Sequence, residues 1–469
     1  MTLPKQSSPR PRRLRTVTAS RAVAFDVIMS VEVDDAYANL ALPAKIREAN
    51  LDTPDAGLAT ELTYGTLRMQ GFYDRVIANA AARDIDTIDT ATLVILRLGV
   101  HQLLSMRVPD HAAVDESVNM AEHYASRGAV GFVNAVLRRV SRRDRDDWLD
   151  FVSRDAPSED ERLSIMYSHP VWIVRALRLA LESEGRGEEL QTLLSADNAS
   201  PQVTLVALPG ITEAAVLLED VVRTPYSPYG FTLDDGGDPA RVTAGSGGMI
   251  RVQDEGSQLA ALSLSREAAV SSDQKWLDMC AGPGGKAALL AAEATLSGAT
   301  LIANEIVPTR AGLVKQALEA FPGVEVVTGD GTLCGQESPD TFDRILLDAP
   351  CTGLGALRRR PEARWRKQPR DVGELAALQS QLLASAVAAL KPGGVVAYVT
   401  CSPHLAETRG IVEGALRKFP GVHELDAKAV VRSVSESEID LAGSALSVQL
   451  WPHRHGTDAM FIALLQKDQ

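Results

Sequence analysis

The chain has 469 residues, of which 45% are apolar, 23% charged and 5% aromatic. Globular chains of this length divide into two or three domains. The 48 basic and 61 acidic residues give a formal net charge of −13. This charge excludes a polycation that binds nucleic acid through its overall field, so any RNA contact must come from local basic patches.

Cysteine is scarce and has no spacing typical of a structural site. Four cysteines, too few and too far apart for a disulfide scaffold, are present, and no pair forms a C-x-x-C zinc motif. No apolar run reaches the roughly 18 residues needed to cross a bilayer. We therefore expect a cytoplasmic protein in a reducing setting, with no metal and no membrane partner.

The N-terminus is basic and contains no early helix signal. Residues 1–25 carry six cations and no acid, and three prolines fall within the first 11 positions. A transit sequence would share this composition. Because proline breaks helices, we instead expect a disordered basic tail over residues 1–18.

Residues 19–145 have the pattern of an all-α domain. Apolar residues recur at steps of three and four, as in Leu93, Leu96 and Val100. The segment 131–139 ends in two arginines, which suit the negative end of a helix dipole. A charged linker is expected over 146–170, followed by a small α/β subdomain over 171–250.

From residue 251 to 469 short apolar runs alternate with helical segments. The expected strands are 276–279, 301–305, 324–328, 344–348 and 395–400. This alternation predicts a doubly wound, mostly parallel sheet whose ligand crevice lies at the carboxyl ends of the strands.

The loop after the first of these strands is rich in glycine. Its residues are Cys280, Ala281, Gly282, Pro283, Gly284, Gly285 and Lys286. Such a loop lets the backbone approach a ligand and places a helix N-terminus beside an anion. With Ala287 it also satisfies the relaxed dinucleotide fingerprint, so a nicotinamide enzyme stays open, whereas a Walker A loop is excluded.

Acids end the next two strands. Glu305 lies about 20 residues past the loop, where a carboxylate can bind the ribose of an adenosine cofactor. Asp330 ends the third strand and can accept a hydrogen bond from the adenine amino group. The alternative for Asp330 is a helix N-cap, which aspartate also favours.

Two cysteines follow the last two strands of the series. Cys351 stands in Asp348-Ala349-Pro350-Cys351, and Cys401 stands in Thr400-Cys401-Ser402. A single cysteine is more often a small buried apolar residue than a nucleophile. Two cysteines at neighbouring ligand-facing strand ends favour a chemical role.

The motifs D-x-C-A-x-P-G-G-K, D-A-P-C-x-G-x-G and T-C-S together resemble one family. They are similar to the RNA cytosine carbon-5 methyltransferases of class I fold that use S-adenosylmethionine, in particular the bacterial small-subunit ribosomal RNA enzymes of Sun/Fmu type. Residues 253–258 resemble the segment before that family's first strand. Residues 55–65 and 131–137 resemble its antitermination-factor-like helical domain, which makes residues 19–145 an RNA-binding domain and 251–469 the methyltransferase domain.

The resemblance implies a role for each motif residue. Cys401 is the nucleophile that adds to carbon 6, Cys351 assists product release, and Asp348 recognises the base beside the cofactor. The loop 280–286, Glu305, Asp330 and Asp348 would bind S-adenosylmethionine. For Lys286 a structural salt bridge is the alternative. The sequence departs from the family at Ala287, at 403–408 and at 459–460.

A basic run follows the Cys351 turn directly. We expect it to contact RNA phosphates, with the tryptophan stacking on an unpaired base, through Arg358, Arg359, Arg360, Arg364, Trp365, Arg366 and Lys367. The alternative is a solvated charged face. Arg138 to Arg145 and the tail would extend this track.

The main expectation is therefore a monomeric enzyme that methylates small-subunit ribosomal RNA. The same chemistry on tRNA stays open. A nicotinamide-dependent oxidoreductase explains the loop and Glu305 but gives Cys351 and Cys401 no role. A non-catalytic RNA-binding assembly factor would not need both cysteines and Asp348.

Overall fold

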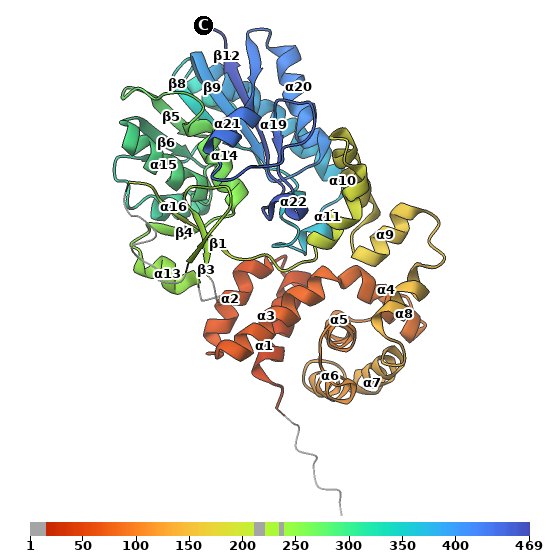
Figure 1. Cartoon of the computed structure of the whole chain (residues 1–469). Coiled ribbons are helices and arrows are strands. Elements are labelled where there is room, and N and C mark those ends of the chain that lie inside the picture. Colours follow the sequence, from red (N-terminus) through yellow and green to blue (C-terminus); the bar gives the residue numbers. More distant parts are fainter. Residues whose placement is uncertain (1–15, 211–220, 234–238) are drawn as a thin grey trace, which may run out of the picture. The chain divides into compact units, whose positions relative to one another are not determined.

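The computed structural model describes residues 16–210, 221–233 and 239–469, so nearly all of the expected basic tail lies outside the described residues. Two compact units divide the chain. The first comprises the residues up to Val171 together with Arg360–Glu362, and the second comprises Trp172–Arg359 and Ala363–Gln469. Figure 1 labels most of the helices and strands of both units.

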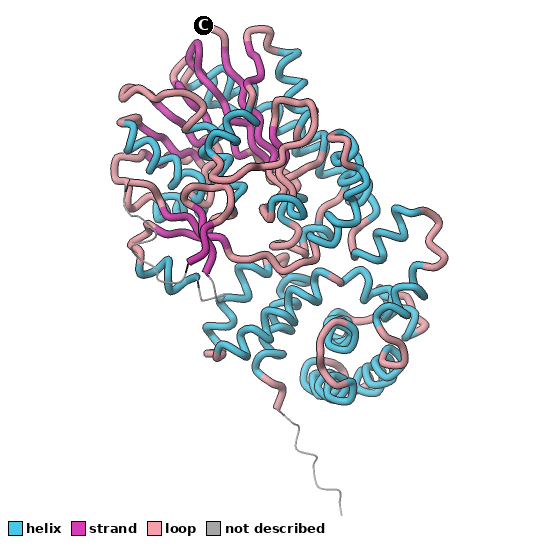
Figure 2. The backbone as a smooth tube through the Cα atoms, in the orientation of Figure 1, coloured by secondary structure: helices cyan, strands magenta, loops and turns pink. Residues whose placement is uncertain are grey.

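The first unit is all-helical in its described part (Figure 2). Helix α5 packs against five other helices of the unit. Its residues are apolar almost all round, which is the pattern of a central buried helix. The helices are α1 (Ala19–Val33), α2 (Ala38–Glu48), α3 (Thr53–Arg68), α4 (Gln70–Ala81), the 3-10 helix η1 (Ile85–Thr87), α5 (Thr90–Leu104), α6 (Asp110–Tyr124), α7 (Ala129–Val140), α8 (Arg145–Ser153) and α9 (Glu159–Tyr167).

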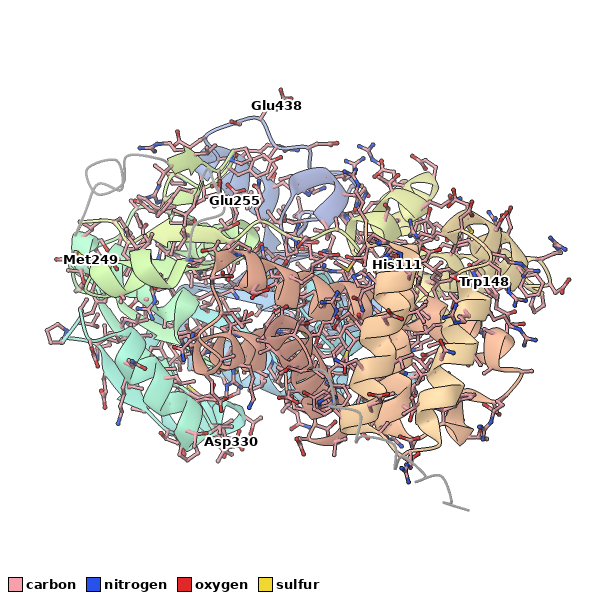
Figure 3. All side chains as sticks on the ribbon, turned by 90° about the horizontal axis from the view of Figure 1, so that it is seen from below. His111, Trp148, Met249, Glu255, Asp330 and Glu438 are labelled. Atoms are coloured by element: carbon pink, nitrogen blue, oxygen red, sulfur yellow. The ribbon has the colours of Figure 1, made fainter. Side chains whose placement is uncertain are left out.

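Helices α8 and α9 occupy the stretch that the sequence analysis treats as a linker. Asp144 and Ser158 cap them, accepting hydrogen bonds from backbone N–H groups three residues ahead. Trp148 is buried, and its Nε1 donates to the Val140 carbonyl at 2.9 Å (Figure 3). The charged residues of this stretch therefore cover two short helices with buried faces.

A buried ion cluster joins three helices of the first unit. Arg97 on α5 is 5% exposed. Its guanidinium donates to both carboxylate oxygens of Asp74 at 2.7 and 2.8 Å and to Glu32 at 3.0 Å. Two carboxylates thus satisfy one buried cation, as burial of a charge requires.

The second unit begins with helices α10 (Val171–Ser183), η2 (Gly187–Glu189) and α11 (Leu190–Ala196). A four-stranded antiparallel sheet in the order β2-β3-β1-β4 follows. Its core consists of Leu205, Ala207, Phe231 and Ile250. The elements are β1 (Thr204–Ala207), β2 (Val221–Arg223), β3 (Gly230–Leu233), α13 (Pro239–Gly245) and β4 (Ile250–Val252).

The larger sheet has the strand order β10-β12-β9-β8-β5-β6-β7, with β11 paired to β12. Strands β5 to β9 are mutually parallel, whereas β12 runs antiparallel to β9 and β10. The strands are β5 (Lys275–Asp278), β6 (Thr300–Asn304), β7 (Glu325–Val327), β8 (Phe342–Asp348), β9 (Leu390–Thr400), β10 (Val422–Leu425), β11 (Val448–Gln449) and β12 (Phe461–Lys467). This topology confirms the expected Rossmann-like domain.

Each face of the larger sheet has its own core. Successive side chains of a strand point to opposite faces, so Leu346 belongs to one core while Ile345 and Leu347 belong to the other. The first core includes α14 (Glu255–Ser265), α15 (Gly285–Ser297), α16 (Pro308–Ala317) and α21 (Ala427–Val434). The second includes α19 (Pro369–Ala389) and α20 (Arg409–Lys418).

Short helices complete the loops of this unit. They are η3 (Gly331–Leu333), α17 (Cys334–Glu337), η4 (Leu354–Ala356), α18 (Ala363–Arg366), η5 (Leu405–Glu407) and α22 (Pro452–His455). Within the described chain, α19 is the one helix whose length and apolar composition would suffice to cross a membrane. It packs against β8 and β9, and this contact explains its apolar face.

The Arg97 cluster leads to a stability prediction. Arg97→Met leaves two partly exposed carboxylates without their cation, which we expect to cost about 2 kcal/mol or more. Native-state hydrogen exchange of the α4 and α5 amides should then accelerate about 30-fold. Arg162→Met, which removes an exposed pair with Glu159, is the control and should cost less than about 1 kcal/mol. Equal effects of the two substitutions would contradict the prediction.

Candidate active site

The carboxyl ends of four parallel strands bring the predicted residues to one edge of the larger sheet. Asp278 ends β5, Glu305 follows β6, Asp348 ends β8 and Cys401 follows β9. Register places Asp278 opposite Leu346 of β8, and Asp348 opposite Val399 of β9. The strand-end edge, where the sequence predicts the ligand crevice, therefore carries three acids and a cysteine.

At two positions of the loop, close contacts leave room only for glycine. A Cβ on Gly282 would lie 2.2 Å from the Glu305 carboxylate. Gly284 has a φ of +108°, and a Cβ there would lie 2.4 Å from that of Ala317. Glycine alone accommodates both constraints. The loop thus passes directly over Glu305 before it enters α15.

Glu305 is 3% exposed and already holds the loop. Its Oε2 accepts from the Gly282 N–H and its Oε1 from the Val307 N–H, both at 3.0 Å. Arg310 lies 3.7 Å from the same carboxylate. Each carboxylate oxygen has a second lone pair, so Glu305 can hold the loop and still accept from a ligand hydroxyl.

Asp278 is a site residue that the sequence analysis quoted within its motif without giving it a role. Its side chain is fully buried, with the Cys280 backbone N–H beside its carboxylate and no side-chain donor bonded to either oxygen within the described chain. Burial, reinforced by the nearby Asp348, raises the pKa of Asp278 to about 8. A buried carboxyl at a strand end that lacks side-chain donors is suited to a cationic or hydrogen-bond-donating ligand group.

Lys286 forms an ion pair with Asp348. Its Nζ donates to Oδ2 of Asp348 at 2.7 Å. Burial lowers the pKa of Lys286, but the Asp348 carboxylate outweighs this effect and the net shift is upward. The salt bridge named as the alternative for Lys286 is therefore present, and it joins the glycine loop to the residue expected to recognise the base.

Cys351 and Cys401 lie on neighbouring loops. Burial, together with the charge of Glu407, raises the pKa of Cys351 to about 12, while the backbone N–H groups of Gly353 and Cys401 hydrogen-bond its sulfur. Burial also raises the pKa of Cys401 well above its ordinary value, and Lys286 opposes this shift. Both thiols are consequently protonated at neutral pH in the unliganded site.

The remaining predicted residues at this edge have varied settings. Cys280 is half-buried, and its shielding from solvent, together with the charge of Asp278, raises its pKa. Asp330 is exposed at the end of the loop after β7 (Figure 3) and caps η3, accepting from the Thr332 N–H at 2.9 Å, which is the capping alternative. The described residues contain no group of three or more His, Cys, Asp or Glu side chains arranged to hold a metal ion.

The basic run does not present all of its cations to solvent. Arg358 and Arg359 each form ion pairs with Asp254 and Asp458, at N–O distances between 2.8 and 3.5 Å. The two acids come from distant parts of the chain, before β5 and before β12. Buried carboxylates need cationic partners, so the described structure gives these two arginines a structural task.

Other members of the run divide between the interior and the surface. Arg364 is fully buried and donates to Asn198 and to the Asp197 carbonyl. Trp365, Arg366 and Lys367 are half-buried, and Arg360 is exposed with its guanidinium 5.7 Å from the ring centre of Tyr37. A role in RNA contact thus remains a proposal for the outer part of the run.

Two family models match the chain. Residues 268–466 match the model described as 16S rRNA methyltransferase RsmB/F. Residues 18–142 match the model of the NusB family. The two matches cover the larger sheet and the all-helical domain respectively.

Relatives match over nearly the full length. A Mycobacterium tuberculosis protein that is named only as a methyltransferase is 46% identical over 460 residues, covering 97% of this chain and 98% of its own. The ribosomal RNA small subunit methyltransferase B of Pseudomonas putida is 31% identical, covering 87% of this chain and 91% of its own. The crystal structure of PH0851 has the same fold, with a TM-score of 0.79, 22% identity and coverage of 96% and 98%.

The buried Asp278 carboxyl makes folding pH-dependent. Unfolded, Asp278 ionises near its ordinary pKa of 3.8, whereas the folded chain keeps the proton up to about pH 8. Its contribution to stability is therefore present at low pH and declines as pH rises through that window, by up to about 1.4 kcal/mol per pH unit. Asp278→Asn removes this dependence.

Urea unfolding of both proteins at several pH values between about 5 and 8 measures the effect. We expect the variant to gain stability relative to the parent chain as pH rises. A difference that stays constant across this range would show that Asp278 is ionised in the folded chain.

Proposed function

Because this chain belongs to the RsmB/F family of 16S rRNA methyltransferases, we propose that it transfers a methyl group to carbon 5 of a cytosine in small-subunit ribosomal RNA, through a covalent cysteine adduct. The observation that carries the proposal is the convergence of Asp348, Cys351 and Cys401 at adjacent strand ends. An oxidoreductase would leave both thiols without a task.

The loop and its acids fit S-adenosylmethionine. The buried Asp278 carboxyl, which no side chain of the described residues hydrogen-bonds, can take the ammonium group of the methionine portion, and Glu305 retains lone pairs for the ribose hydroxyls. Asp330 is assigned to the adenine, and residues 280–286 to the methionine portion. When bound, S-adenosylmethionine supplies the electrophilic methyl group that cytosine carbon 5 accepts.

The attack on the base is assigned to Cys401. Carbon 5 of cytosine is a weak nucleophile, and addition of sulfur to carbon 6 converts the ring into an enamine that is reactive at carbon 5. The high pKa of the Cys401 thiol means that its proton must leave as the bond forms. We propose that Asp348, which Lys286 holds in place, passes this proton to ring nitrogen 3 of the cytosine.

Release is assigned to Cys351. Water takes the carbon 5 proton, the C5–C6 double bond reforms, and the sulfur of Cys401 leaves. Cys351, protonated because its pKa is about 12, donates its proton to the departing sulfur. The proton on ring nitrogen 3 then returns to the sulfur of Cys351 through solvent, which restores both thiols.

The substrate and setting follow from the relatives and the charge distribution. The methyltransferase B relative of Pseudomonas putida is named for small-subunit ribosomal RNA, which favours that RNA over tRNA. Outer cations of the basic run are assigned to phosphate contact, and the target base must leave its stack to reach Cys401. We place the protein in the cytoplasm, acting as a monomer.

Substitution of the two cysteines tests the proposal. Cys401→Ala should abolish methylation, measured as labelled methyl incorporation into 16S rRNA. Cys351→Ala should instead accumulate a protein–RNA adduct that survives denaturing electrophoresis, because attack proceeds while release stalls. An adduct in the Cys401 variant alone would reverse the two roles.

Bisulfite sequencing of total RNA with and without the gene would identify the cytosine, and an unchanged profile would contradict the proposed chemistry.

RNA binding by the outer run predicts a salt-dependent decrease of affinity. Replacing Arg360 and Lys367 together by alanine should weaken RNA binding and lower the slope of log affinity against log salt by about 0.7 for each phosphate that is no longer neutralised. Arg417→Ala removes an exposed cation on α20 and is the control for the removal of surface charge. An unchanged slope in the double variant would place the RNA elsewhere.

A further inference from the structure

Glu407 is a fully buried carboxylate to which the proposed chemistry gives no contact with the reacting atoms, although its charge helps to raise the pKa of Cys351. It ends η5, six positions after Cys401 in the chain. Oε1 accepts from the Thr352 N–H at 2.8 Å and from Gln379 Nε2 at 3.2 Å. Oε2 accepts from the Thr352 hydroxyl at 2.5 Å and from the Ser402 hydroxyl at 2.7 Å.

These donors belong to the two cysteine loops. Thr352 directly follows Cys351, and Ser402 directly follows Cys401. Gln379 of α19 also donates to the Pro350 carbonyl at 2.9 Å, on the other side of Cys351. One carboxylate therefore bridges the loop of the release cysteine and the loop of the attacking cysteine.

The bonding pattern excludes direct chemistry by Glu407. A carboxylate offers about four acceptor sites, and four donors already occupy them. No site remains for a substrate proton. A buried negative charge stabilised by neutral donors is also costly to keep, so its place between the two thiol loops calls for a reason in the reaction.

We propose that Glu407 is a positioning residue for product release, acting through the peptide that carries Cys351. Thr352 donates two of the four hydrogen bonds to Glu407, one from its backbone N–H and one from its hydroxyl. Gln379 donates a third and also donates to the Pro350 carbonyl. Glu407 reaches the Cys401 side through one of the four bonds, from the Ser402 hydroxyl, which also pairs with the Thr352 hydroxyl and accepts from the His404 N–H, both at 3.2 Å. Removal of Glu407 should therefore misplace Cys351 more than Cys401. The assignment rests on the proposed function.

The test separates attack from release. RNA in which 5-fluorocytidine replaces cytidine forms the Cys401 adduct and accepts the methyl group, but cannot complete release because carbon 5 carries no proton. The rate of adduct formation on 16S rRNA of this kind reports attack and methyl transfer without release. Steady-state methylation of ordinary 16S rRNA reports the full cycle.

Glu407→Ala removes all four acceptor sites, and Glu407→Gln keeps an oxygen for the Thr352 N–H. We expect turnover to fall by about tenfold or more in Glu407→Ala, with partial recovery in Glu407→Gln. Adduct formation on the fluorinated RNA should stay within about threefold of the parent rate, and adduct should accumulate on ordinary RNA. Glu413→Gln, at an exposed acid of α20, is the control and should change neither rate.

Thr352→Val covers the case in which Glu407→Ala does not fold, because it keeps the shape of the side chain and removes one hydrogen bond to Glu407. It should show the same pattern to a smaller degree. Adduct formation and turnover that fall in parallel, or turnover that is unchanged, would overturn the assignment. A parent enzyme that forms no adduct on the fluorinated RNA would instead overturn the proposed function on which the assignment rests.

Discussion

The ion pair between Lys286 and Asp348 determines the electrostatics of the strand-end edge. Asp278 and Glu305 are buried there, and Asp348 is partly exposed beside them. Like charges at such a site disfavour joint ionisation. Lys286 offsets the charge of Asp348 directly. It also opposes the upward pKa shifts of Asp278 and Cys401, which remain raised overall. One lysine on the glycine loop thus binds Asp348 and acts electrostatically on both Asp278 and Cys401.

This coupling explains how thiols shielded from solvent can serve a nucleophilic mechanism. Both cysteines are half-buried, and their raised pKa values favour the protonated thiol, which is the less reactive form. A thiol of high pKa is unreactive until a substrate accepts its proton. In the proposed mechanism cytosine nitrogen 3, held by Asp348, is that acceptor, so Cys401 becomes a nucleophile only when the correct base is in place.

The strand-end residues could be predicted from the sequence because a parallel sheet brings residues that follow apolar runs to one edge. Glu305, Asp348 and Cys401 are near one another for that reason. The ion-pair and hydrogen-bond partners of the site residues could not be predicted in this way. Nothing local to Arg358 shows that Asp254 and Asp458, about a hundred residues away on either side, supply its counter-charges. The motif that contains Asp278 assigns it no role, and Glu407 lies outside the motifs that carry the resemblance. The importance of both lies in what surrounds them, burial without a side-chain donor for Asp278 and four donors for Glu407.

The division of the basic run also changes what the net charge means. Arg358 and Arg359 are neutralised by two buried acids, so they contribute little to the field outside the protein. The surface that faces RNA must therefore attract phosphates with fewer cations than the sequence suggests, in a chain whose net charge is −13. The attraction exerted by the outer cations decays within a Debye length. In the proposed function, selection of the target therefore depends more on local fit at the Cys401 edge, where Asp348 is assigned to the base, than on long-range attraction.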